Sequence, residues 1–179
     1  MGLWKRDIDW VTEASQRIGC CGIAEWLPDF AAWAELTPVE CPPAALAAKA
    51  DYASVSRGLK ITLLHPFSER VPVADPQAWV LYDIQIDAAA MPLPFGLDAR
   101  GETPQGARRK LSDDTAFGRP VDLRNGKHRI VHYLPDGRVV GVVFKPSMMG
   151  IEGLHLQRIL TMPDFRSLGA AGTLASGRP

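Results

Sequence analysis

Histidines are the first side chains to test for metal or acid–base chemistry, and the chain has four: His65, His128, His132 and His155. His128 and His132 are four residues apart in a segment whose pattern favours a strand. On a strand this spacing puts both rings on one face, about 13 Å apart. One metal ion could not bind both, so we expect solvent-facing strand residues and no metal site.

The three cysteines, Cys20, Cys21 and Cys41, offer no clear chemistry. Their number is odd, neighbouring cysteines rarely form a disulfide, and no C-x-x-C pair suggests a metal. A nucleophilic cysteine favours a helix N-terminus, whereas Cys20 follows an expected helix end at Gly19. We expect reduced thiols in a cytoplasmic protein.

The neighbouring charged residues of the chain also have explanations that involve no catalysis. Asp113 and Asp114 could act in acid–base chemistry, but neighbours in a loop usually point apart, so they are either solvated or an acidic contact edge. The basic run 108–110 ends an expected helix, where cations complement the dipole. The sequence has no H-E-x-x-H, Walker or G-x-S-x-G signature. It therefore predicts no enzyme and no cofactor.

Composition narrows the class of partner. The 179 residues carry 20 basic and 20 acidic side chains, so the formal net charge is zero. This balance argues against a nucleic-acid binder with a global basic field, and against an acidic nucleic-acid mimic. No apolar stretch approaches the ~20 residues needed to span a bilayer, and the N-terminus lacks the apolar region of a secretory signal. We expect no nucleic acid and no membrane among its partners.

Short helices must position these residues in the first part of the chain. The apolar spacing predicts helices at 9–18, 28–36 and 43–50. Asp9 is expected to cap the first and Gly19 to end it. In the second helix Pro28 and Asp29 suit the first turn, and Pro38 stops it; the third, rich in alanine, starts at Pro43.

Tryptophan is concentrated near these helices: Trp4, Trp10, Trp26 and Trp33 are four of the five in the chain. One interpretation is that they fix short helices onto a larger core, because a helix of under ten residues is marginal alone. The alternative is a ligand pocket lined by Trp26, Trp33, Cys20 and Cys21. The sequence leaves both open.

Strand patterns follow. Apolar residues alternate over 59–63 and 80–86, which indicates two strands, each with one buried face. A second set is expected at 128–134, 138–145 and 154–160, with Pro135-Asp136-Gly137 as a turn. In the first strand of this set, either Ile130 and Leu134 or Val131 and Tyr133 face inward.

A further helix is expected at 103–111, between the two sets of strands. Thr103 caps it, Pro104 takes the first helical position, and Ala107 and Leu111 face inward. Gly106 weakens it by roughly 1 kcal/mol relative to alanine.

The order of elements predicts an α+β fold, with antiparallel sheet and short helices packed on one face. We expect two tandem helix-plus-meander units in one compact domain, over residues 1–90 and 91–163. Residues 164–179, rich in Gly, Ala and Ser, are expected to be a flexible tail.

Three stretches carry a family resemblance: Leu-Pro-Phe-Gly-Leu at 93–97, the hairpin around 135–137, and the upstream blocks 52–61 and 79–84. Over about residues 45–160 the chain resembles small bacterial immunity-type proteins encoded beside secreted toxins. The helix-plus-meander units are similar to β-lactamase-inhibitor-like folds. The resemblance implies a non-catalytic cytoplasmic protein that binds and neutralises a cognate toxin, and it supplies no catalytic residue.

The expected partner surface combines an open sheet face with the loop 113–124. The predicted contact residues are Asp83, Gln85, Asp113, Asp114, Arg129 and His132. Two other hypotheses remain, a small-ligand protein or enzyme with a pocket at the Trp-rich helices, and a structural module of a secretion system. The oligomeric state is left open.

Overall fold

The computed structural model describes residues 2–19, 23–39, 49–64, 79–111, 121–123, 127–134 and 137–158. The helices and strands in chain order are α1 (Gly2–Arg17), α2 (Leu27–Ala34), β1 (Thr37–Val39), β2 (Lys49–Ser54), β3 (Leu59–Leu64), β4 (Val80–Asp87), α3 (Pro104–Lys110), β5 (Val121–Leu123), β6 (Lys127–Tyr133), β7 (Arg138–Phe144) and β8 (Ile151–Arg158). In this part of the chain no helix is long and apolar enough to cross a membrane.

The eight strands of the described residues form one antiparallel sheet in the order β1-β2-β3-β4-β8-β7-β6-β5. Consecutive strands β1 to β4 form one meander and β5 to β8 another, and β4 pairs with β8 at the centre. The predicted α+β fold with an antiparallel sheet and short helices is therefore confirmed. The boundaries drawn at 90 and 163 stay a prediction.

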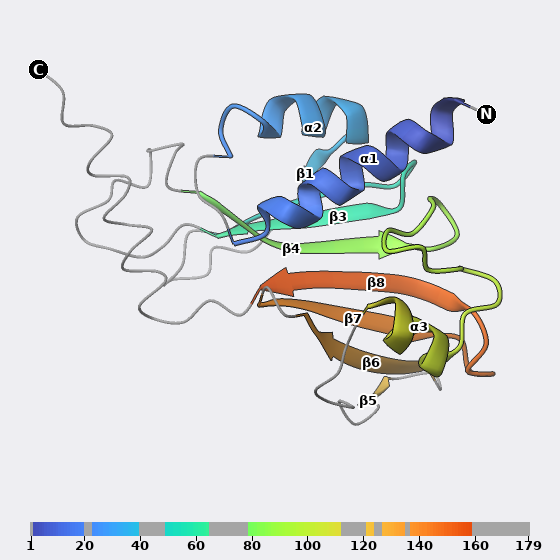
Figure 1. Ribbon diagram of the computed structural model, residues 1–179. Coiled ribbons are helices and arrows are strands. Elements are labelled where there is room, and N and C mark those ends of the chain that lie inside the picture. The colour runs from blue at the N-terminus through green and yellow to red at the C-terminus, as the bar shows by residue number, and fades with distance from the viewer. Residues whose placement is uncertain are drawn as a thin grey trace, which may run out of the picture.

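The helices cover one face of this sheet (Figure 1), which we call the helix face. α1 and α2 lie over the half formed by β1 to β4, and α3 lies over β6 and β7. A continuous apolar core joins side chains from all three helices to β3, β4, β6, β7 and β8. Its fully buried members include Val11, Phe30, Ile61, Ile84, Ala107, Val142 and Leu154. The opposite side of the sheet is called the open face.

Helix α1 begins at Gly2, so the expected cap at Asp9 is wrong. Val11 and Ala14 of this helix are buried, as their spacing predicted. Its predicted end is confirmed, because Gly19 has φ +78° and donates its N–H to the Leu81 carbonyl oxygen at 2.8 Å. This bond fixes the end of α1 to β4.

Helix α2 has Pro28 in its first turn as predicted, but it ends at Ala34 rather than 36. Glu35 turns the chain with φ 54°, so Pro38 is not the stop and instead lies in edge strand β1. An edge strand tolerates proline because one side of it has no hydrogen-bonding neighbour. The third expected helix, 43–50, lies outside the described residues up to 48, and Lys49–Ala50 belong to β2, so its predicted end is wrong.

Strand β4 departs from the expected alternation. Leu81 and Asp83 are both buried, although the pattern placed them on the exposed side. The register runs from Thr62 opposite Asp83 to Leu63 opposite Leu81, which leaves Tyr82 as an extra residue in a bulge. A bulge changes which side chains face the core, and for this reason the simple one-face prediction is wrong here.

Helix α3 and the second meander follow the predictions closely. The Thr103 hydroxyl accepts the Gly106 N–H at 3.1 Å, and Ala107 and Leu111 are buried. Gly137 has φ +82° at the turn into β7. The expected last strand starts earlier, at Ile151, and the expected tail 164–179 lies outside the described residues.

Candidate functional site

Polar side chains gather on the open face near the centre of the sheet. Ile84 of β4 is opposite Leu156 of β8, and both are in the core. Their neighbours Asp83, Gln85 and His155 therefore point to the open face, because side chains alternate along a strand. Together with Arg129 of β6, these three residues form what we call the polar cluster.

Asp83 is the most enclosed member of the polar cluster, with 3% of its surface exposed. Its Oδ2 accepts a hydrogen bond from Gln85 Nε2 at 2.7 Å. Its Oδ1 is buried and has no hydrogen-bond partner in the part of the chain that the structure describes. Such an atom costs stability, so its presence in a folded protein calls for an explanation.

Arg129 reaches the polar cluster across a glycine. A Cβ placed on Gly141 would lie 3.3 Å from Arg129 Cδ and 3.5 Å from the Cβ of His155. The stem of Arg129 thus lies over Gly141, between β6 and β8, where a larger residue would displace it. Its Nε is buried and lacks a hydrogen-bond partner within the described ranges.

The pKa of His155 depends on its burial and on two charged neighbours. Burial lowers the pKa of His155 below its usual 6.5, the negative charge of Asp83 opposes this, and the positive charge of Arg129 adds to it. The imidazole is therefore neutral near pH 7, when it can both donate and accept a hydrogen bond.

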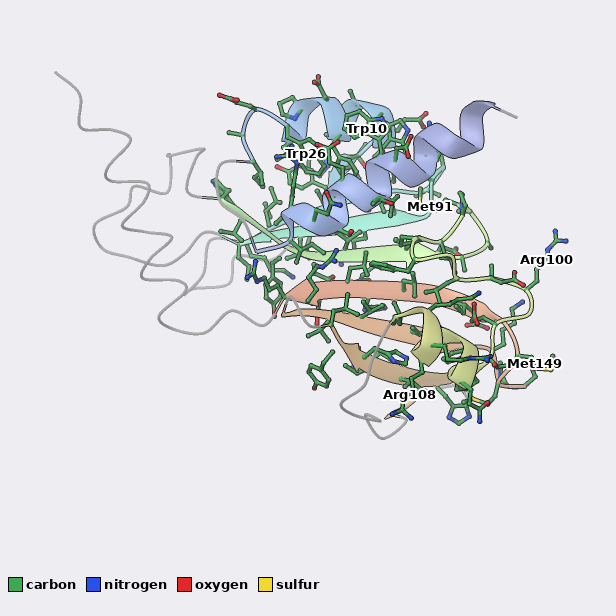
Figure 2. The ribbon with its side chains drawn as sticks, in the orientation of Figure 1. Trp10, Trp26, Met91, Arg100, Arg108 and Met149 are labelled. Atoms are coloured by element: carbon green, nitrogen blue, oxygen red, sulfur yellow. The ribbon has the colours of Figure 1, made fainter. Side chains whose placement is uncertain are left out.

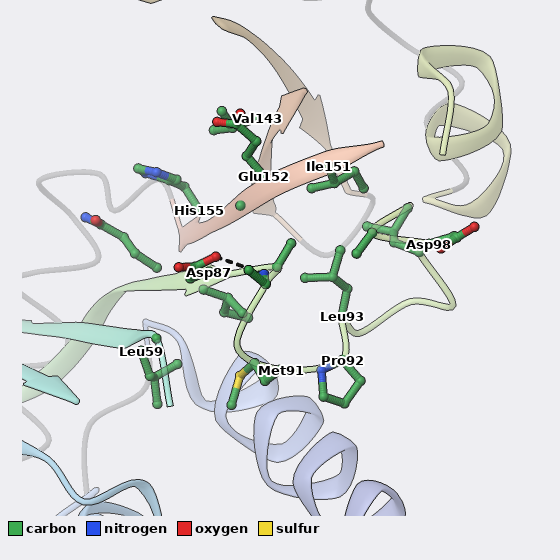
Figure 3. A pocket seen from close by; sticks show the side chains of 18 of the residues that line it. Leu59, Asp87, Met91, Pro92, Leu93, Asp98, Val143, Ile151, Glu152 and His155 are labelled. Carbon is green, nitrogen blue, oxygen red and sulfur yellow. Dashed lines mark hydrogen bonds between the residues drawn. The ribbon is translucent and has the colours of Figure 1, made fainter. Parts of the chain in front are cut away.

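A large open groove adjoins the polar cluster (Figure 3), and its volume is about 1250 Å³. Gln85 and His155 belong both to the groove and to the polar cluster. The remaining walls come from the ends of β3, β4, β7 and β8 and from the loop after β4. Figure 3 shows His155 at one end and Asp98 at the other, with Ile151 and Leu93 between them. The segment 93–97, which carries the family resemblance, contributes to this wall.

The acidic side chains of the groove are held by their own loops. Asp98 accepts the N–H of Arg100 at 2.9 Å and that of Gly101 at 3.1 Å, and these bonds, the Arg100 one foremost, lower its pKa. Asp87 Oδ1 accepts the Ala89 N–H at 2.9 Å (Figure 3). Glu152 is also engaged with another group of the protein.

The basic side chains of the groove are less fully neutralised. Among the described residues, no ion pair involves Lys145 or Arg100. Lys60 Nζ lies 3.8 Å from Asp51 Oδ2, an oxygen that is already 2.9 Å from Lys49 Nζ. The described lining of the groove thus has three cations and three carboxylates, the latter on Asp87, Asp98 and Glu152.

The predicted contact residues divide into three groups. Asp83, Gln85 and Arg129 lie together on the open face, although Asp83 is buried rather than solvated. His132 is wrongly predicted: it lies opposite Val140 on the helix face and is 2% exposed. Asp113 and Asp114, like the rest of loop 113–120, lie outside the described residues.

The error at His132 follows from the choice of inward face in β6. Ile130 is in the core, so the first of the two alternatives holds and His132, two residues on, shares its side of the sheet. His128 is on the same side, opposite Phe144, and is partly buried. The expectation that His128 and His132 face solvent is thus wrong for His132.

Sequence reasoning missed His155 and the groove. The alternation Leu154, His155, Leu156, Gln157 did indicate a polar open face in β8. The groove itself had no signal, because it combines a loop with strands that are distant in sequence.

Three tryptophans, Trp10, Trp26 and Trp33, pack around Phe30, which is fully buried. Its ring centroid lies 4.5 Å from that of Trp26, 5.4 Å from Trp33 and 6.1 Å from Trp10; Figure 2 labels Trp10 and Trp26 near α1 and α2. Arg17 lies over the Trp26 ring at 5.2 Å. The large groove lies elsewhere, and Cys20 and Cys21 are outside the described residues.

No group of three His, Cys, Asp or Glu side chains within the described ranges could hold a metal ion. Comparison with protein-family models, with curated proteins and with solved structures finds no match. The resemblance to immunity-type proteins therefore stays a prediction, and the function rests on the geometry of the groove and the polar cluster.

Proposed function

We propose that this protein is a non-catalytic binding protein that holds a protein partner at the groove formed by the ends of β3, β4, β7 and β8 and the loop after β4. In keeping with the sequence resemblance, the partner is a cognate toxin that the protein neutralises in the cytoplasm. The observation that carries the proposal is the groove of about 1250 Å³ whose cations Lys145 and Arg100 have no ion-pair partner among the described residues.

Two further features support binding at this place. The groove is continuous with the polar cluster, where Asp83 Oδ1 and Arg129 Nε are buried without hydrogen-bond partners in the described chain. Native folds keep few such atoms, and those that persist often belong to functional surfaces. The segment 93–97, on which the resemblance rests, also lines the groove.

The test is co-expression with the product of the neighbouring gene. The tagged protein should capture that product and restore growth to cells that express it. Gln85→Arg, which puts a long charged side chain at the junction of groove and polar cluster, should reduce both capture and rescue. The matched control is Gln105→Arg, at an exposed position of α3.

A wild-type protein that neither captures nor rescues would contradict the proposal. So would a Gln85→Arg variant that folds and performs both as well as the wild type.

A further inference from the structure

We infer that Lys110, which is not among the residues that line the groove, is a positioning residue for it. Its ion pair with Glu102 holds the loop 98–101 where this loop forms part of the groove wall, and loss of the Lys110 charge frees the loop and weakens partner binding. The inference rests on the proposed function and adds a way in which a side chain outside the binding site regulates it.

The ion pair joins a buried carboxylate to an exposed amine. Glu102 lies just before α3, and only 4% of its side chain is exposed. Its Oε2 accepts a hydrogen bond from Lys110 Nζ at 2.6 Å, and within the described ranges this is the one ion pair of Glu102. Lys110 is the last residue of α3, with 40% of its side chain exposed. The buried carboxylate therefore depends on a cation that solvent and other molecules can reach.

Glu102 also fixes the loop that precedes it. The same Oε2 accepts the Asp98 N–H at 2.9 Å, and the Glu102 N–H donates to the Asp98 carbonyl oxygen at 3.2 Å. The pKa of Asp98 is lowered mainly by the Arg100 N–H, and the positive charge of Lys110 adds to this. One carboxylate oxygen thus connects the end of α3 to the start of the loop.

The loop in turn lies against the turn between β7 and β8. Gly150 donates its N–H to the Glu102 carbonyl oxygen at 2.8 Å, and Ile151 donates to that of Ala99 at 3.0 Å. A Cβ on Gly150 would lie 2.7 Å from a carbonyl oxygen of the loop, so the two backbones are in close contact. Residues 98–100 line the groove (Figure 3). Movement of the loop away from this turn would therefore change the shape of the groove.

Removal of the Lys110 charge leaves the Glu102 carboxylate buried without a cation. Breaking a buried ion pair in this way is strongly destabilising, because the remaining charge has lost its solvation. The carboxylate regains solvation when it turns outward to water, and this movement breaks its bond to the Asp98 N–H. The loop then opens locally, which requires no unfolding of the rest of the protein.

Amide hydrogen exchange of the full chain, measured by NMR without a partner, is the first test. In Lys110→Met, which removes the charge and keeps the length, the Gly150 and Ile151 amides should exchange about tenfold faster, as expected for loss of one charge-assisted hydrogen bond. Lys110→Arg keeps the charge and should restore the wild-type rates. Arg109→Met is the matched control, because it makes the same charge change at an exposed position of α3.

Two further measurements distinguish a positioning residue from a merely structural one. In the Glu102→Gln background the buried side chain is neutral and needs no cation, so Lys110→Met should change the exchange rates little. With the product of the neighbouring gene as the probe, Lys110→Met should lose affinity, since fewer molecules have the groove in its binding shape. Lys110→Arg and Arg109→Met should bind this probe as the wild type does.

Unchanged exchange of Gly150 and Ile151 in Lys110→Met would overturn the inference, and so would the same acceleration in the Glu102→Gln background or in Arg109→Met. Faster exchange together with wild-type affinity for the probe would also overturn it, because the ion pair would then stabilise the loop without affecting binding. Failure here is distinct from failure of the proposed function, which is read from capture and rescue by the wild-type protein.

Discussion

Truncation of Phe30 separates the two interpretations of the tryptophan-rich region. If Trp10, Trp26 and Trp33 are core, Phe30→Ala removes the ring on which they pack and destabilises the fold strongly. If they line a ligand pocket, the region is already partly empty and truncation costs little. The structure supports the first interpretation, because the Phe30 side chain is fully buried.

The magnitude follows from the packing. Truncation of a buried phenylalanine to alanine costs about 3–5 kcal/mol. Three aromatic rings lie within 6.1 Å of the Phe30 ring, centroid to centroid, and each such pair adds roughly 0.5–1.5 kcal/mol beyond burial. We therefore expect a loss in the upper part of the range, about 4–5 kcal/mol, which lowers Tm by about 8–20 °C for a chain of this size.

The assay is urea denaturation followed by circular dichroism and by tryptophan fluorescence. Phe30→Leu keeps most of the volume but loses the three aromatic pairs, and should cost about 1.5 kcal/mol or more while staying below the cost of Phe30→Ala. Val55→Ala, at a side chain 98% exposed, should have no effect. A loss below about 1 kcal/mol for Phe30→Ala would refute the reasoning. The helices would then contribute little to the core, and the pocket hypothesis would regain support.

Three other changes test the local arguments. Burial lowers the pKa of His155 below 6.5, so the unfolded state binds more protons than the folded state between the folded pKa and 6.5. The free energy of unfolding should therefore fall as the pH decreases through this window. His155→Gln should remove that part of the fall. Gly106→Ala should destabilise the fold by about 1–2 kcal/mol, although alanine has the better helix propensity, because the new Cβ would collide with the buried Glu102 carboxylate. The control is Gln105→Ala, at an exposed position of the same helix, which should not destabilise the fold. Thr103→Ala should cost about 1 kcal/mol through loss of the helix cap, and thermal unfolding that matches the wild type would contradict that role.

Among the predictions that depended on local chemistry, those at Thr103, Pro104 and Gly137 were confirmed, whereas the Asp9 cap and the Pro38 stop were wrong. Thr103 and Pro104 start α3 because a hydroxyl cap and a fixed φ act within one helical turn. Gly137 makes the turn into β7 because its own backbone permits φ +82°. Nothing outside a few residues decides these features, so the sequence contains enough information to predict them.

The pairing of β6 with β7 was predicted correctly, but two predictions of which side chains face outward failed because they depended on a partner element. The bulge at Tyr82 exists only relative to β3, and the inward face of β6 is set by which side the helices cover. His132 and Asp83 were therefore assigned to solvent on patterns that could not include those neighbours. The groove is a stronger case, since Lys60, Arg100 and Lys145 are separated by tens of residues and line one groove only in the folded protein.

The two faces of the sheet serve different physical ends. The helix face holds the continuous apolar core, from which most of the stability derives. On the open face, Asp83 is nearly as buried as that core, yet one of its oxygens has no partner among the described residues, at a cost of about 1–3 kcal/mol. A face selected for stability alone would have an apolar side chain there or expose the carboxylate to water. The polar cluster therefore lowers the stability of the open face at the place where it adjoins the groove.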